Sequence, residues 1–273
     1  MRFGKLLWFD MKNGWLKVPI VFICPILFSF FCFLEVRRKN LIWEKTIGIG
    51  DYWLYLYGGM REYVPVQGNA FTFPTVWIGL FLFCSFMVLN YPLRDLHNIG
   101  TQILIRTKGR TFWWLSKCFW NFASTISYHG IVFLTLGLMC FIFHVPFIWQ
   151  LNAEAVSCMF GLFLDEVPSG RIPFLVFWIP VILSVAINLF QMMLTLFFKP
   201  IFSYLFSCAL FLTSSYLMSP IVLGNYGMVL RTKWINKQGV SPEVGIIICL
   251  AISGIAIIGG GIRFCNMDIL NES

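Results

Sequence analysis

The sequence predicts an all-α, polytopic membrane protein with six transmembrane helices and both termini in the cytoplasm. Of its 273 residues, 59% are hydrophobic and only 12% are charged, whereas soluble domains carry roughly a quarter charged residues. The mean hydropathy is +0.79, and the apolar residues gather in runs long enough to cross a bilayer. Because a backbone in lipid must satisfy its own hydrogen bonds, these runs are expected to be helical.

Six apolar runs give the expected spans. A hydrocarbon core needs about 20 apolar residues in a helix, and the runs lie at about 18–34, 71–90, 118–143, 173–198, 201–223 and 244–262. The first is short and contains Pro19 and Pro25, and the fourth and fifth meet in a tight hairpin at Lys199 and Pro200. We therefore divide the chain into residues 1–17 and a transmembrane domain of residues 18–273.

Residues 1–17 are predicted to form an amphipathic helix at the membrane surface. At a helical period of 3.6 residues the apolar side chains share one face and the basic ones share the other, namely Phe3, Leu7, Trp8, Met11 and Trp15 against Arg2, Lys5, Lys12 and Asn13. Such a helix lies in the membrane plane with its basic side towards the headgroups. It would serve either as a plain anchor or to transmit motion to the spans.

The distribution of basic residues sets the expected orientation. With both termini inside, eleven of the 20 Lys and Arg residues lie in cytoplasmic segments and nine lie in outer loops. The positive-inside rule favours this arrangement by a narrow margin, since Arg37, Arg38 and Lys39 fall in the first outer loop. The net charge of +8 is expected to meet membrane lipids and not nucleic acid, because the cations border apolar runs.

Motifs for catalysis are missing from the sequence. It contains no GxxxxGK[ST], GxSxG or HExxH motif, so no catalytic residue, bound cofactor or metal site is expected. The spans hold almost no charged residues between their ends, which disfavours ion-coupled transporters and intramembrane proteases. His129, within the third span, is expected to form a hydrogen bond with a neighbouring helix, and a proton relay is the alternative role.

Uncharged polar residues form stripes on the third and fourth spans. Residues of this kind either join helices by hydrogen bonds or line a transport pathway or a subunit interface, and the sequence favours the first role while leaving the second open. In the last span, Ala256 and Gly260 have the spacing of a close helix contact. Helical spacing places each stripe on one face of its span, and the residues are Ser184, Asn188, Gln191 and Thr195 in the fourth and Asn121, Ser124, Thr125 and Tyr128 in the third.

A basic, aromatic segment connects the second and third spans. It reads NIGTQILIRTKGRTFWWLSK at residues 98–117. Aromatic residues are favoured at membrane interfaces, and basic connections are favoured on the cytoplasmic side. The segment is therefore expected to contact lipid headgroups or a soluble partner.

The chain resembles the permease subunit of type-2 ATP-binding-cassette exporters of Firmicutes bacteria. The resemblance rests on the six spans, the amphipathic N-terminal helix and the segment just described. In addition, GNYGMVLR at residues 224–231 is similar to the outer turn before the last span, and IRFCNMDIL at 262–270 is similar to the family's short tail. Two features depart from the family: the first outer loop is unusually basic, and the large extracellular domain of some relatives is missing.

The resemblance implies a transporter subunit of the bacterial cytoplasmic membrane, without an ATPase site of its own. Its partners would be a separate nucleotide-binding subunit, which holds ATP and Mg, and a second permease that is either a copy or a sister chain. The cargo would be an amphipathic, bacteriocin-like peptide, a lipid or a drug. The alternative is a non-transporting scaffold or sensor subunit of a membrane complex.

The resemblance also assigns roles to individual residues. A coupling helix at about 96–108 would dock on the ATPase through an apolar stripe flanked by cations. The implied docking residues are Ile99, Gly100, Ile103, Leu104, Arg106, Lys108 and Arg110, and those implied at the membrane interface are Trp113, Trp114 and Lys117.

Overall fold

A computed structural model describes residues 3–16, 20–43, 46–65, 70–96, 104, 109–161 and 169–267. Within these ranges the chain is all-α, with a few 3-10 and π turns and one isolated β-bridge between Thr232 and Val240. Four helical segments are long and apolar enough to cross a membrane, which indicates a multi-pass membrane protein. They are Thr75–Asp95, Arg110–Ile142, Phe174–Leu194 and Pro242–Asn266.

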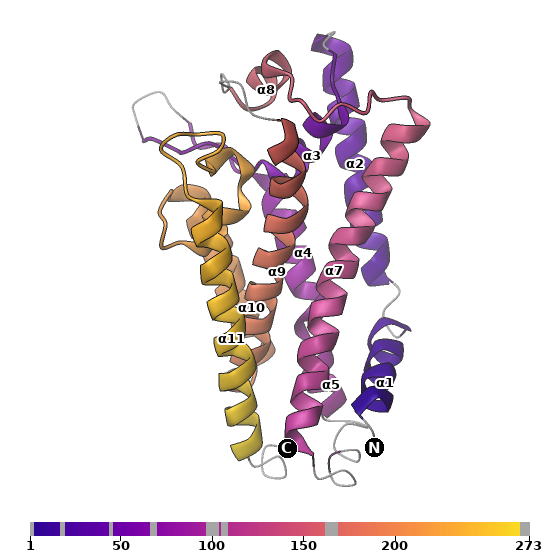
Figure 1. Cartoon of the computed structure of the whole chain (residues 1–273), viewed down its shortest axis with the longest axis vertical. Coiled ribbons are helices and arrows are strands. Elements are labelled where there is room, and N and C mark those ends of the chain that lie inside the picture. The colour runs from indigo at the N-terminus through magenta and orange to yellow at the C-terminus, as the bar shows by residue number, and fades with distance from the viewer. Residues whose placement is uncertain are drawn as a thin grey trace.

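The long helices run side by side and alternate in direction between two ends of a bundle (Figure 1). One end, here called the terminal end, carries both chain termini together with α1 and α5, and the opposite loop end carries α3 and α8 (Figure 1). The helices are α1 (Phe3–Leu16), α2 (Ile20–Trp43), α3 (Ile49–Tyr57), α4 (Thr75–Leu89), α5 (Tyr91–Asp95), α7 (Arg110–Ile142), α8 (Ala153–Phe160), α9 (Ile179–Leu194), α10 (Pro200–Tyr216) and α11 (Pro242–Asn266).

Three helix boundaries differ most from those predicted. Helix α2 continues past residue 34 to Trp43, since Glu35 pairs with Arg38 and Lys39 one turn later, at 3.0 and 3.5 Å. Helix α7 begins after Gly109, two turns before the predicted span, so residues 110–117 of the basic segment are helical. Helix α10 ends at Tyr216, and the chain then turns through a short 3-10 helix at Leu223–Gly227.

Helix α1 lies along the first part of α7 (Figure 1). Its buried side chains recur every four residues, at Leu6 and Asp10. Gly14 continues this line, and a Cβ at that position would meet the indole of Trp120 at 2.1 Å, so the absence of a side chain allows close packing on α7. The predicted apolar face is only partly covered, since Met11 packs against a cluster that includes Tyr91 and Trp120, whereas Trp8 is 72% exposed.

The loop end is held together by two buried charged side chains. Asp51 accepts hydrogen bonds from the backbone amides of Gly48 and Asn152 at 3.0 and 3.1 Å, which joins α3 to the segment before α8. Burial raises the pKa of Asp51 to about 6, although both amides act to lower it.

Arg231 is the second of these groups and is fully buried. It donates to the Asn225 amide oxygen and to backbone carbonyls that follow α3 and end α10, including those of Met60 and Ser215 at 3.0 and 2.8 Å. Helix C-termini carry partial negative charge, which suits a cation. Burial lowers the pKa of Arg231 to about 10, so it stays charged at neutral pH. This arginine is the last residue of the GNYGMVLR turn, and its hydrogen bonds attach that turn to the end of α10.

Candidate functional site

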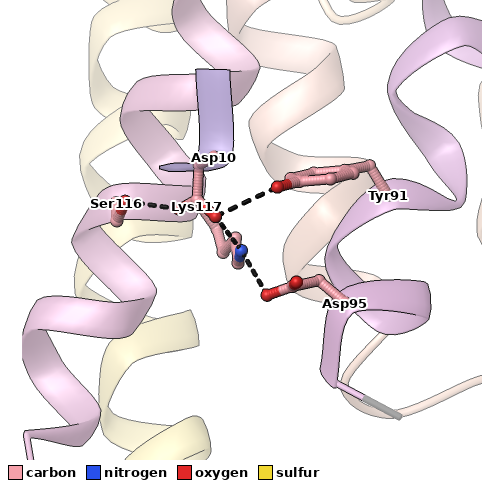
Figure 2. Close-up of polar contacts among 5 residues, drawn as sticks. All are labelled: Asp10, Tyr91, Asp95, Ser116 and Lys117. Atoms are coloured by element: carbon pink, nitrogen blue, oxygen red, sulfur yellow. Dashed lines mark hydrogen bonds and ion pairs between the residues drawn. The ribbon is translucent and has the colours of Figure 1, made fainter. Parts of the chain in front are cut away.

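A buried cluster of charged side chains occupies the terminal end of the bundle. The ammonium of Lys117, on α7, lies 2.5 Å from Oδ1 of Asp10 and 2.6 Å from Oδ2 of Asp95. The two carboxylates come from α1 and α5, and Figure 2 shows Lys117 between them. One lysine therefore joins three helices that are far apart in the sequence.

Two further side chains complete the hydrogen bonds of Asp10. The hydroxyl of Tyr91 donates to its Oδ1 at 3.0 Å, and the hydroxyl of Ser116 donates to its Oδ2 at 2.5 Å (Figure 2). The rings of Tyr91 and Trp113 each lie 4.8 Å from the Lys117 ammonium, in cation–π geometry. Asp10 and Lys117 are fully buried, and Asp95 is 8% exposed. Burying these charges is costly unless they are paired in this way.

The cluster spans the two ends of the segment predicted to dock on a partner. Asp95 is the last residue of α5, and Lys117 lies two turns into α7. Their ion pair fixes the start of the segment relative to its end, and Asp10 ties both to α1. Any force on this segment would therefore act on three helices at once.

An apolar cluster lies beside the charges and includes Leu96, Leu104 and Trp113. Trp113 stacks on Phe264 of α11, with centroids 4.6 Å apart. Trp114 donates from its indole nitrogen to the carbonyl of Ile257 at 2.8 Å. These contacts attach the first turns of α7 to the last turns of α11.

The implied docking residues fall into two groups. Ile99, Gly100, Ile103, Arg106 and Lys108 lie outside the described residues. Leu104 is buried, with 7% exposure, and Arg110 donates to the carbonyls of Cys265 and Met267 at 2.9 and 2.7 Å. Leu104 and Arg110 thus hold the segment onto the bundle, and their docking role stays a prediction.

Trp113, Trp114 and Lys117 were expected at the membrane interface. Their side chains are 2%, 1% and 0% exposed, so within this chain they contact protein and not lipid headgroups. The reason is the early start of α7, which directs both indoles towards α11 and the lysine towards α1 and α5. Their depth in a membrane stays a prediction.

The two polar stripes face each other in the interior of the bundle. Asn188 connects them, because its side chain accepts from Ser85 at 2.8 Å and donates to Thr125 at 3.0 Å. Asn121 donates to the backbone carbonyl of Asn188 at 3.1 Å. These groups form hydrogen bonds between α4, α7 and α9 and are almost completely buried. This geometry corresponds to the packing role and not to the lining of a route through one chain.

The other members of the stripes are also bonded within the chain. Gln191 donates to the Ser85 carbonyl at 3.0 Å and accepts from Ser207 at 2.6 Å, which adds α10 to the network. Tyr128 donates to the carbonyl of Leu80 at 2.9 Å, and Thr195 donates to that of Met192 at 2.6 Å. Ser124 is fully buried on the same face of α7.

His129 links three helices, as expected for a hydrogen-bonded intramembrane histidine. Its Nε2 lies 2.8 Å from the Ser184 hydroxyl, and its Nδ1 lies 3.0 Å from the hydroxyl of Tyr57. Both ring nitrogens are therefore in hydrogen-bond contact with hydroxyl groups. No cluster of three His, Cys, Asp or Glu side chains suited to a metal ion occurs among the described residues.

Sequence reasoning missed both carboxylates of the cluster, and Asp10 is the one that a local pattern could have identified. It is the only acidic residue before Glu35 in a strongly basic N-terminal region. It also lies four residues from both Leu6 and Gly14, the two other buried positions on its face of α1. A lone carboxylate among lysines, on the face with the small glycine, is the signal that could have identified it.

Comparison with known proteins adds no relative to these observations. No protein-family model matches the chain, and the searches of curated proteins and of solved structures give no match.

Proposed function

We propose that this chain is the permease subunit of a type-2 ATP-binding-cassette exporter in the bacterial cytoplasmic membrane. In this proposal α2 and α10 complete six spans with the four long apolar segments, and the terminal end faces the cytoplasm. A separate subunit hydrolyses ATP, and a second permease, identical or a sister chain, completes the transporter. The cargo is an amphipathic peptide or a lipid.

The observation that carries the proposal is the position of the charged cluster. A coupling segment must pass movement of the ATPase into the spans without unfolding. The Lys117 bridge to Asp10 and Asp95 holds both ends of residues 96–117 to α1, at 2.5 and 2.6 Å. Closure of the ATPase against the segment would move α1, α5 and the start of α7 as one body.

The resemblance and the composition support the same reading. A transporter driven by a partner's ATP needs no proton or ion relay in its spans, and the described spans carry uncharged polar residues that bond to one another. Since these bonds are made within one chain, we place the cargo route between two permeases and not inside one of them.

Charge reversal in the docking segment tests the proposal. Tagged protein carrying Arg106→Glu and Lys108→Glu should lose the co-purifying ATPase while it still inserts in the membrane. The matched control is Lys12→Glu with Lys199→Glu, which reverses two exposed cations elsewhere. Leu104 is unsuitable for this test because it is buried. An ATPase retained equally by both double variants would exclude docking through this segment.

A scaffold or sensor is the second candidate function. One observation favours it: the polar side chains of the two stripes form hydrogen bonds within the chain. The two candidates differ in energy coupling. An exporter's ATPase should be stimulated by added cargo peptide in proteoliposomes, whereas a scaffold should leave ATP hydrolysis unchanged.

A further inference from the structure

A pocket of about 460 Å³ is lined by residues of α3 and α8, the helices of the loop end. Its walls come from α2, from α3 and the chain that follows it, from the first turn of α4 and the residues before it, and from the end of α8. Lining residues include Lys39, Tyr55, Arg61, Phe73, Trp77 and Phe160. The volume lies in the range of about 300–1,000 Å³ that is usual for small-molecule sites.

The charged groups of this pocket are both positive. Lys39 and Arg61 line it, and no acidic side chain lies among the described residues that do so. Glu35 is the nearby counter-charge, at 3.5 Å from the Lys39 ammonium. One guanidinium nitrogen of Arg61 donates to the carbonyl of Gly161 at 3.2 Å, which holds the arginine beside α8. The described side chains that line the pocket therefore carry a net positive charge.

The rest of the lining is aromatic and apolar. Trp77 is buried at the base, where its indole nitrogen donates to the carbonyl of Gly227 at 2.9 Å. Phe73 is 46% exposed beside it. A ligand that fits here has a negatively charged group next to the cations and an apolar part against the rings.

The pocket continues into apolar surface along α2 and α4. On α2, Phe28 and Phe31 precede Lys39 by three and two turns on the same side of the helix. On α4, Phe83 follows the pocket residue Val76 by two turns, and its ring lies 6.3 Å from that of Phe28. Phe31 and Phe83 are 63% and 48% exposed. In a membrane these side chains meet acyl chains, so a lipid at this place already has its apolar part in position.

We propose that this pocket binds the phosphate headgroup of an anionic membrane lipid, with Lys39 and Arg61 as its cationic ligands. The headgroup lies against the rings at the loop end, and the acyl chains follow the exposed surface of α2 and α4. The proposal is independent of the partner ATPase, because it concerns the opposite end of the molecule.

Lipid binding to detergent-solubilised protein tests this site. Native mass spectrometry should show phosphatidylglycerol bound in preference to phosphatidylcholine with the same acyl chains. Each basic side chain near a membrane contributes a factor of about five to the binding of anionic lipid. Lys39→Gln with Arg61→Gln should therefore weaken phosphatidylglycerol binding by about 30-fold.

The charge-matched control is Arg38→Gln with Lys233→Gln, which removes two exposed cations outside the pocket. It should leave binding unchanged. Equal affinity for the two lipids, or equal binding by both double variants, would overturn the proposal. Displacement of the lipid by inorganic phosphate would assign the site to a soluble anion, and displacement by an acidic peptide would assign it to a peptide.

A measurement on the unaltered protein covers the case in which the double variant does not fold. Photoactivatable phosphatidylglycerol should label residues 55–61 and 70–77 in the wild-type chain. Labelling confined to other segments would refute the pocket assignment.

Discussion

Removing the charge of Lys117 should destabilise the protein more than any other single loss of charge at the terminal end. At an effective dielectric constant of about 20, each contact at 2.5 or 2.6 Å is worth about 6 kcal/mol of gross attraction. Burial of the charges offsets much of this. Loss of one partner from a buried ion pair nevertheless costs about 3–5 kcal/mol, because it leaves an unpaired charge. Lys117→Met keeps most of the side-chain volume and leaves the carboxylates of Asp10 and Asp95 buried without their cation.

The assay is unfolding of the purified protein in mixed micelles as the fraction of denaturing detergent rises. Lys117→Met should lower the free energy of unfolding by about 3–5 kcal/mol. Adding Asp10→Asn and Asp95→Asn should restore most of it, since the triple variant buries no unpaired charge. A control, Lys12→Met, removes an exposed cation from α1 and should change stability by less than about 0.5 kcal/mol. A Lys117→Met protein as stable as the wild type would refute the electrostatic reasoning.

Three further changes test other parts of the structure by the same unfolding assay. Asn188→Ala removes the link between the polar stripes and should cost about 1–2 kcal/mol. Gly260→Val places a Cβ 2.2 Å from the Trp114 ring and should cost about 1–3 kcal/mol, whereas Gly254→Val, in open space, should cost much less. The difference in unfolding free energy between the wild type and Asp51→Asn depends on pH. The pKa is raised to about 6 in the folded chain, so protonation stabilises the wild type fully below about pH 4. That contribution of about 3 kcal/mol is lost as the pH rises from about 4 through about 6, and the variant should not show this loss.

Each of these three predictions has a result that would contradict it. Equal stability of the two glycine variants would mean that α11 does not approach α7 closely. A stable Asn188→Ala protein would show that the stripe contributes little to packing, and would reopen its role as a pathway. A pH profile shared by the wild type and Asp51→Asn would place the titration elsewhere.

Hydropathy predicted where the helices of the bundle lie, because a helix that crosses lipid needs a continuous run of apolar side chains and the local sequence alone reveals such a run. The six apolar runs overlap α2, α4, α7, α9, α10 and α11. Within the described residues, four helical segments, which include α4, α7, α9 and α11, are long and apolar enough to cross a membrane, and spans at α2 and α10 stay predictions. The boundaries were less predictable, because they depend on features outside the apolar runs. Helix α2 extends through a charged turn stabilised by Glu35, and α7 begins at a glycine within a basic segment. A charged helical turn or a glycine in a basic segment does not raise the local mean hydropathy, whereas an apolar span does.

The polar stripes were predictable for the same reason, whereas their partners were not. Helical spacing alone put Ser184, Asn188 and Gln191 on one face. It could not say that the face meets Thr125 of α7, because that contact depends on how the helices are arranged in space. The burial of both sets in one network favours the packing role over a pathway through the chain.

The charged cluster could not be predicted from local sequence patterns. Lys117 lies 22 residues from Asp95 and 107 from Asp10, so no local sequence pattern joins the three residues. In the sequence the lysine is simply one of several cations in a basic connection. Its burial has a consequence for the segment's charge. Lys117 is neutralised by two carboxylates and Arg110 is bound to the end of α11, so these two of the segment's four cations are engaged within the chain. The other two, Arg106 and Lys108, lie outside the described residues, and we expect them to meet an outside partner. Electrostatic recognition of this segment should therefore depend on those two residues. Salt that weakens ATPase co-purification should lose its effect when both are replaced by glutamine.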